Sequence, residues 1–77
     1  MSPEQARAAR GWLGWSQQEL AKRAHVSLST VHEFERGQRT PTANNLRAMR
    51  VAFEEAGIEF IPNGVVVHAT AREPKAE

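Results

Sequence analysis

Apolar residues recur at helical spacing along most of this chain, in stretches that open with a capping residue and close with a glycine. Serine or threonine can cap a helix at four starts: Ser2, Ser16, Ser27 and either Thr42 or Thr40. Glycines that can adopt the left-handed conformation end three of the stretches, at Gly14, Gly37 and Gly57. The pattern therefore predicts four short helices within residues 1–57.

Two of these starts carry a further signal. Gln5 stands three residues after Ser2, and Glu19 stands three residues after Ser16, so that each pair can form a capping box. The inward faces of the helices predict a core, which consists of Leu20, Ala21, Val31, Phe34, Leu46, Met49 and Phe53.

The periodicity changes after Gly57. Residues 58–61 and 65–67 are rich in β-branched or aromatic side chains, and Pro62-Asn63-Gly64 between them is a turn sequence. We expect a strand pair or hairpin within residues 58–69, followed by a polar tail over 70–77. The predicted fold class is mainly α, with four helices and a C-terminal β-strand or hairpin.

Length and composition narrow the possible functions. The 77 residues suffice for one small domain, and the absence of cysteine excludes disulfides and thiolate zinc sites. No apolar run has membrane-spanning length and no signal-peptide pattern opens the chain, which predicts a cytoplasmic protein away from the membrane. Its three histidines lack metal-ligand spacing, and the chain contains neither aspartate nor a glycine-rich phosphate loop. We therefore expect no enzymatic activity, no metal and no cofactor.

The net charge of +1 is unevenly distributed. Residues 1–53 contain eight arginines and lysines against four glutamates, an excess of +4, whereas residues 54–77 contain two against five, an excess of −3. A positive field over the helical part suits an anionic partner such as nucleic acid.

The segment from Ser16 to Ser27 is the most informative part of the chain. It contains two capped helix starts separated by one short helix and a tight turn. This is the spacing by which a helix-turn-helix presents its second helix to a DNA groove. Double-stranded DNA is therefore the predicted partner.

Residues 7–56 resemble the lambda-repressor-like helix-turn-helix domains of the Cro/repressor type, also called the xenobiotic-response-element family. The matching positions are Arg10, Leu13-Gly14, Ser16-Gln17, Glu19-Leu20-Ala21, Val26-Ser27, Thr30-Val31, Phe34-Glu35-Arg36-Gly37, Pro41 and Leu46. The resemblance implies a compact helical domain that binds operator DNA, usually as a dimer. The continuation from Ala56 to Pro62 resembles short bacterial regulators that append a strand to this domain.

The third predicted helix supplies the candidate base contacts, because its first turns enter the major groove in such domains. Its outward residues are Leu28, Ser29, His32 and Glu33. Leu28 can pack on a thymine methyl, His32 can bind a guanine or a phosphate, and Glu33 can accept from a cytosine amino group. Ser29 can bond to several bases. None of the four is the arginine or glutamine that makes a bidentate pair with guanine or adenine, so we expect moderate sequence discrimination.

Predicted phosphate contacts are Gln17, Ser27, Thr30, Arg36 and Arg39. The resemblance implies that Gln17 binds a backbone phosphate, and that Arg10 pairs with Glu35 to fix the first helix against the third. The chain departs from the family pattern at His25, where a glycine with positive φ is usual, and at Leu28, which is often polar or basic. Leu28 weakens the case for tight DNA binding.

The β segment predicts a homodimer, since the edges of a two-stranded ribbon favour pairing with another strand. The predicted interface residues are Ile58, Phe60, Ile61, Val65, Val66 and Val67. Alternatively, the hairpin folds back on its own helices. The leading functional hypothesis is a dimeric transcriptional repressor; an antitoxin whose tail binds a toxin, and a protein–protein adaptor that has lost DNA binding, remain alternatives.

Overall fold

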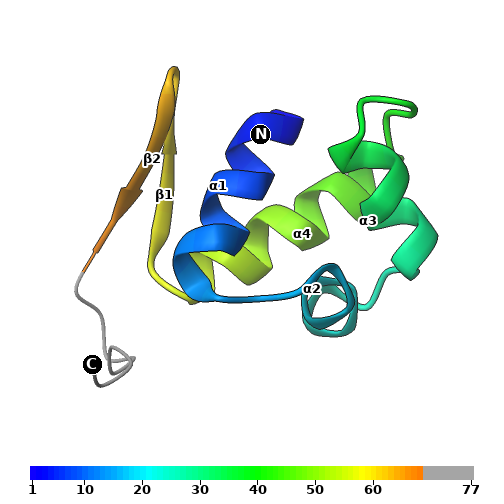
Figure 1. The fold of residues 1–77 in the computed structure, drawn as a ribbon, viewed down its shortest axis with the longest axis horizontal. Coiled ribbons are helices and arrows are strands. Elements are labelled where there is room, and N and C mark those ends of the chain that lie inside the picture. The colour runs from blue at the N-terminus through cyan, green and yellow to red at the C-terminus, as the bar shows by residue number, and fades with distance from the viewer. Residues whose placement is uncertain (69–77) are drawn as a thin grey trace.

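The computed structural model describes residues 1–68, so residue 69 of the expected β segment and the predicted polar tail lie outside the described residues. Four helices precede a hairpin (Figure 1): α1 (Pro3–Leu13), α2 (Gln17–Ala24), α3 (Leu28–Glu35), α4 (Ala43–Glu55), β1 (Ile58–Ile61) and β2 (Gly64–Val67). This architecture confirms the predicted fold class. None of the helices in this part of the chain is long and apolar enough to cross a membrane.

The helix starts follow the predicted caps. The side chains of Ser2, Ser16, Ser27 and Thr42 each accept a hydrogen bond from the backbone three residues on. Thr42 therefore caps α4, in place of the alternative Thr40.

The two predicted capping boxes differ. At α1 both reciprocal bonds are present. At α2 the Ser16 hydroxyl accepts from the Glu19 amide, but the Glu19 carboxylate lies 2.6 Å from Nε of Arg23, one turn further along. The second box is thus only half formed, because a cation attracts the carboxylate more strongly than a neutral amide does.

The turn between α2 and α3 has the conformation expected from its family position. His25 ends α2 with φ 59° and ψ 41°, in the left-handed region. Within residues 1–68 it is the only non-glycine residue with positive φ. Such a conformation costs an L-residue roughly 1–2 kcal/mol. The turn is held by the next residue, since the amide of Val26 donates to the Ala21 carbonyl at 3.0 Å and its side chain packs against the core.

The core joins all four helices and the hairpin. Its largest fully buried side chains are Leu20, Val31, Met49 and Phe53, whereas Leu46 is only partly buried. The Phe53 ring stacks on Trp15, with centroids 5.6 Å apart, and meets the edge of Phe60 at 5.8 Å. Phe53 thereby connects the entry to α2 with β1.

The hairpin packs on its own helices, beside α1 and α4, on the opposite side of the domain from α3 (Figure 1). Its antiparallel register pairs Ile58 with Val67 and Phe60 with Val65. Ile58 is buried, and Phe60 and Val65 pack against the helical core. The side-chain amide of Gln5 on α1 donates to the carbonyl oxygens of Ile61 and Gly64 on either side of the turn. The β segment is therefore anchored within one subunit.

Candidate nucleic-acid interface

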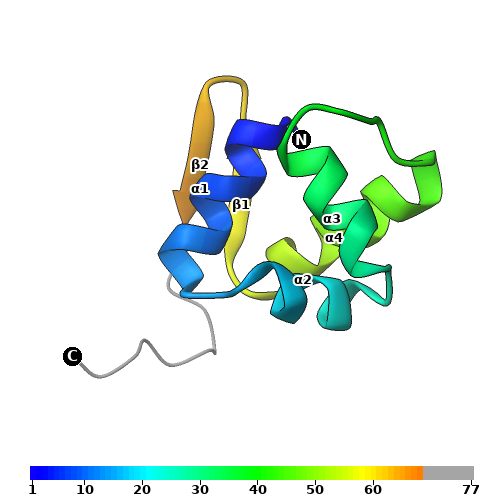
Figure 2. The ribbon, with the colours of Figure 1, turned by 45° about the vertical axis from the view of Figure 1, so that its right-hand side comes forward.

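The helix α3 presents its first turns to solvent, at the end of the domain formed with α2 (Figures 1 and 2). Leu28 is 47% exposed, Ser29 and His32 are exposed, and Glu33 is half-buried. All four predicted base-contact residues thus lie outside the core. The opposite face of α3 is anchored by Val31 and Phe34, which are buried.

Hydroxyl groups cluster at the start of α3. The Ser27 hydroxyl lies 3.1 Å from the Thr30 amide, 2.7 Å from the Thr30 hydroxyl and 3.2 Å from that of Ser29. Because hydroxyls rotate to suit their partners, the group can donate to an approaching phosphate while the cap is kept.

The end of α3 is fixed to α1 by a buried ion pair. The Glu35 carboxylate is 2% exposed and accepts from Nε and Nη2 of Arg10, each at 2.8 Å. Nη1 of Arg10 also donates to the Trp15 carbonyl oxygen at 2.9 Å, and Nη1 of Arg7 donates to the backbone carbonyl of Glu35. This two-pronged geometry orients α3 through its last turn and leaves its first turns free.

The surroundings of Glu35 keep it ionised. Burial raises the pKa of the Glu35 carboxyl, but hydrogen bonds from Arg10 and Gln17 and the charges of Arg10 and Arg7 outweigh burial and hold the pKa below its usual value. The hydrogen bond to Glu35 likewise raises the pKa of Arg10, against the effect of burial.

These shifts predict acid sensitivity. A carboxyl whose pKa is lower in the folded state contributes stability above its unfolded pKa, and that contribution is lost as the pH falls through the folded value. We expect the melting temperature to fall below about pH 4.5, the ordinary pKa of glutamate, and to do so less steeply in Glu35→Gln. Thermal unfolding followed by circular dichroism across this range measures both slopes. Parallel profiles would show that Glu35 does not carry the effect.

A second set of side chains connects the ion pair to the exposed face of α3. Nε2 of Gln17, at the start of α2, donates to Oε1 of Glu35 at 3.1 Å. Oε1 of Gln17 lies 3.3 Å from Nδ1 of His32, whose Nε2 is 3.3 Å from Nη1 of Arg36. Gln17 and Arg36, both predicted to bind phosphate, are thus occupied by neighbouring side chains in the free protein.

A shallow groove runs between α3 and the loop that leads to α4, lined by Ser29, Glu33, Arg39 and Asn45 among others. Arg39 lies 3.7 Å from the Glu33 carboxylate and is 75% exposed, so it is free to move. Asn45 was not predicted as a site residue, although an asparagine amide can bind adenine. Its position in the sequence could have indicated this site, because Asn45 follows the Thr42 cap by three residues and therefore lies in the first turn of α4.

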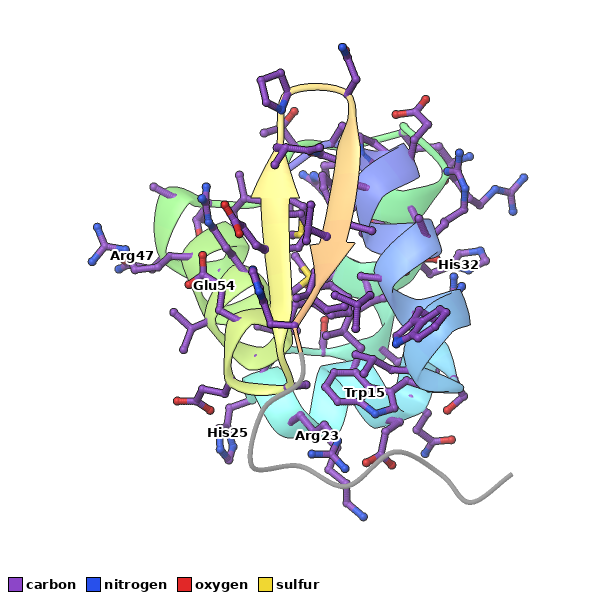
Figure 3. The ribbon with its side chains drawn as sticks, turned by 90° about the vertical axis from the view of Figure 1, so that its left-hand side faces the viewer. Trp15, Arg23, His25, His32, Arg47 and Glu54 are labelled. Atoms are coloured by element: carbon purple, nitrogen blue, oxygen red, sulfur yellow. The ribbon has the colours of Figure 1, made fainter. Side chains whose placement is uncertain are left out.

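On the hairpin side of the domain, two arginines lie over aromatic rings, an arrangement that the sequence analysis did not predict. The Arg23 guanidinium lies 4.4 Å from the Trp15 ring centroid, and Arg50 lies 5.6 Å from that of Phe60. Figure 3 looks onto the hairpin and shows Arg23 beside Trp15. These cations cover the rim of the core and do not extend the α3 face.

The six predicted interface residues divide into two groups. Ile58, Phe60 and Val65 contact the subunit's own core, whereas Ile61, Val66 and Val67 are each 37–38% exposed. The second group therefore offers more apolar surface to a partner than the first.

Residues 7–57 match a protein-family model described as helix-turn-helix. The matched segment extends from within α1 to the end of α4 and includes α2, the His25 turn and α3. No curated protein matches the chain at the level of similarity required.

Proposed function

Because this chain belongs to the Cro/repressor-type helix-turn-helix family of non-enzymatic DNA-binding domains, we propose that it is a transcriptional regulator that binds an operator with α3 in the major groove. The observation that carries the proposal is the exposure of the first turns of α3, within the matched segment and held from behind by the Arg10–Glu35 pair. Regulation takes place in the cytoplasm, by occlusion of a promoter.

Base recognition in this proposal comes from Leu28, Ser29, His32 and Glu33. Glu33 accepts from a cytosine amino group once Arg39 leaves its carboxylate for a phosphate. Ser27 and Thr30 contact the backbone beside the start of α3, as does Gln17 through the NH₂ proton that Glu35 does not engage. Arg36 and Arg39 contact the backbone beyond the end of α3. Most of the affinity is then electrostatic and falls as salt is raised.

A selection of bound fragments from random double-stranded DNA, at two salt concentrations, tests this function. We expect one enriched motif that persists at the higher salt. Recovery of random fragments that are lost at the higher salt would show that the protein binds DNA only non-specifically. That result would favour the adaptor alternative.

The variants Ser29→Ala and Glu33→Ala sharpen the same selection. Each is expected to relax the preference at one or two positions of the motif, by about 1–3 kcal/mol per position. Gln18→Ala, an exposed substitution on α2, is a control that should leave the motif unchanged. Identical motifs for the wild type and all three variants would show that Ser29 and Glu33 on α3 do not recognise bases.

The regulator acts as a homodimer in this proposal, through the outer surface of the hairpin. Ile61 and Val66 supply exposed apolar area there, and Ile58, Phe60 and Val65 hold the hairpin rigidly on its own helices. Val67 pairs with the buried Ile58 and is exposed at the edge of the inner face. A two-fold axis at this surface would have to place the α3 helices about 34–36 Å apart, one DNA turn, for the dimer to bind a palindrome.

Val66→Lys is expected to convert the dimer into a monomer, since it places a charge in the apolar contact. Lysine suits this position because Val66 pairs with Glu59 across the hairpin, so that the subunit itself should stay folded. Val51→Lys, at another exposed valine on α4, is the matched control. Sedimentation at tens of micromolar measures the mass of each protein, and a monomeric wild type would refute the dimer.

A further inference from the structure

The side chains between the buried ion pair and the exposed face of α3 form one uninterrupted series of hydrogen bonds. It runs from Arg10 through Glu35, Gln17 and His32 to Arg36, with donor–acceptor distances between 2.8 and 3.3 Å. It crosses from α1 to α3, then to α2, and back to α3. The direction of every bond in this series follows from two of its members, the Glu35 carboxylate, which can only accept, and the Arg36 guanidinium, which can only donate.

Glu35 fixes the orientation of the Gln17 amide. An ionised carboxylate can only accept hydrogen bonds, so Gln17 must turn its NH₂ group toward Oε1 of Glu35. The reverse orientation would place the amide oxygen against the carboxylate and leave a buried acceptor opposite another acceptor. The oxygen of Gln17 therefore faces outward, toward His32.

The two neighbours of His32 select the same form of its ring. Oε1 of Gln17 can only accept, so Nδ1 of His32 carries the proton. Nη1 of Arg36 can only donate, so Nε2 of His32 bears a lone pair. A neutral imidazole with its proton on Nδ1 satisfies both contacts, whereas free histidine favours the proton on Nε2.

We infer that Gln17 is a positioning residue that makes His32 a hydrogen-bond acceptor toward DNA, and that the operator carries an adenine or a cytosine where His32 contacts a base. In the major groove only these two bases offer an amino group, adenine at N6 and cytosine at N4. Guanine presents the acceptors N7 and O6, which would face the lone pair of Nε2. The inference rests on the proposed function and requires Arg36 to leave Nε2 for the DNA backbone.

Imidazole nitrogen resonances of the full-length ¹⁵N-labelled protein report the tautomer directly, at a mildly alkaline pH at which imidazoles are neutral. We expect protonated Nδ1 and unprotonated Nε2 for His32 in the wild type, and a shift toward the opposite tautomer in Gln17→Leu. The resonances of His25 are an internal reference, and Gln18→Leu is the matched control. Protonated Nε2 in the wild type would overturn the inference.

A selection from random DNA with the wild type, Gln17→Leu and His32→Ala tests the consequence for recognition. One position of the motif should favour adenine or cytosine by about fivefold or more over guanine and thymine. This preference should be lost in both variants. A role of Gln17 in phosphate binding alone would instead weaken all sequences equally and leave the preference intact.

Together, the nitrogen spectra and the DNA selection distinguish failure of the inference from failure of the proposed function. Guanine at the position that depends on His32, or a preference kept in Gln17→Leu, would overturn the inference while a regulator with an operator remained. A wild-type selection without any motif would overturn the proposed function, and with it the role of His32 in recognition, whichever tautomer the spectra show.

Discussion

Replacement of Arg10 by methionine is expected to lower the free energy of unfolding by about 3–5 kcal/mol, the usual cost of breaking a buried ion pair from one side. The Glu35 carboxylate left behind is 2% exposed and would keep the Gln17 amide as its remaining side-chain donor among the hydrogen bonds described. Arg10 itself is 21% exposed. Glu35→Gln should therefore cost less, because the guanidinium can reach water.

Urea unfolding followed by circular dichroism measures both losses, and the double variant Arg10→Met, Glu35→Leu removes both charges together. Removal of both charges should recover much of the loss, since an apolar pair of similar volume often replaces a buried ion pair without penalty. Such a recovery would show that Arg10→Met loses stability because the Glu35 charge is left unpaired, and not because of the methionine side chain. A loss below about 1 kcal/mol in Arg10→Met would mean that the pair contributes orientation alone.

The ion pair affects function through the direction of α3. Both Arg10 and Arg7 reach the last turn of α3 from α1, one at the Glu35 side chain and the other at its backbone carbonyl. Neither residue lies on α3 itself, yet the angle at which that helix meets a groove depends on this attachment. Lower sequence discrimination in a destabilised Arg10 variant would accordingly reflect misorientation and not a lost base contact.

Local signals explain why the helices could be predicted from the sequence. A cap and the glycine or turn that ends a helix act within a few residues, so Ser2, Thr42 and Gly14 mark real boundaries. The same locality explains the error at Glu19, where two partners within one turn compete and the cation of Arg23 wins.

Contacts between distant segments could not be predicted in this way. The attachment of Gln5 to the hairpin spans more than fifty residues of sequence, and no periodicity encodes it. The Arg10–Glu35 pair was expected because a family resemblance supplied the pairing. The link from Gln17 to His32 depends on the angle between α2 and α3, which only the folded domain defines.

The second large effect is expected at Phe53. Its side chain is fully buried, stacks on Trp15 before α2 and meets the edge of Phe60 in β1. Phe53→Ala should cost about 3–5 kcal/mol, as is usual for deletion of a buried aromatic ring. In a domain of this size, such a loss is a large part of the total stability.

The position of Phe53 also predicts how that loss is distributed. Without the ring, β1 loses an aromatic contact that holds the hairpin on α4, so the hairpin should open more readily than the helices. Amide hydrogen exchange resolves this, with faster exchange expected in residues 58–67 than in α3. Val51→Ala, on the same helix but 39% exposed, should change stability by no more than about 0.5 kcal/mol. Uniform exchange throughout Phe53→Ala would mean that hairpin and helices unfold as one unit, so that the hairpin surface proposed for the dimer stays folded for as long as the DNA-binding helices do.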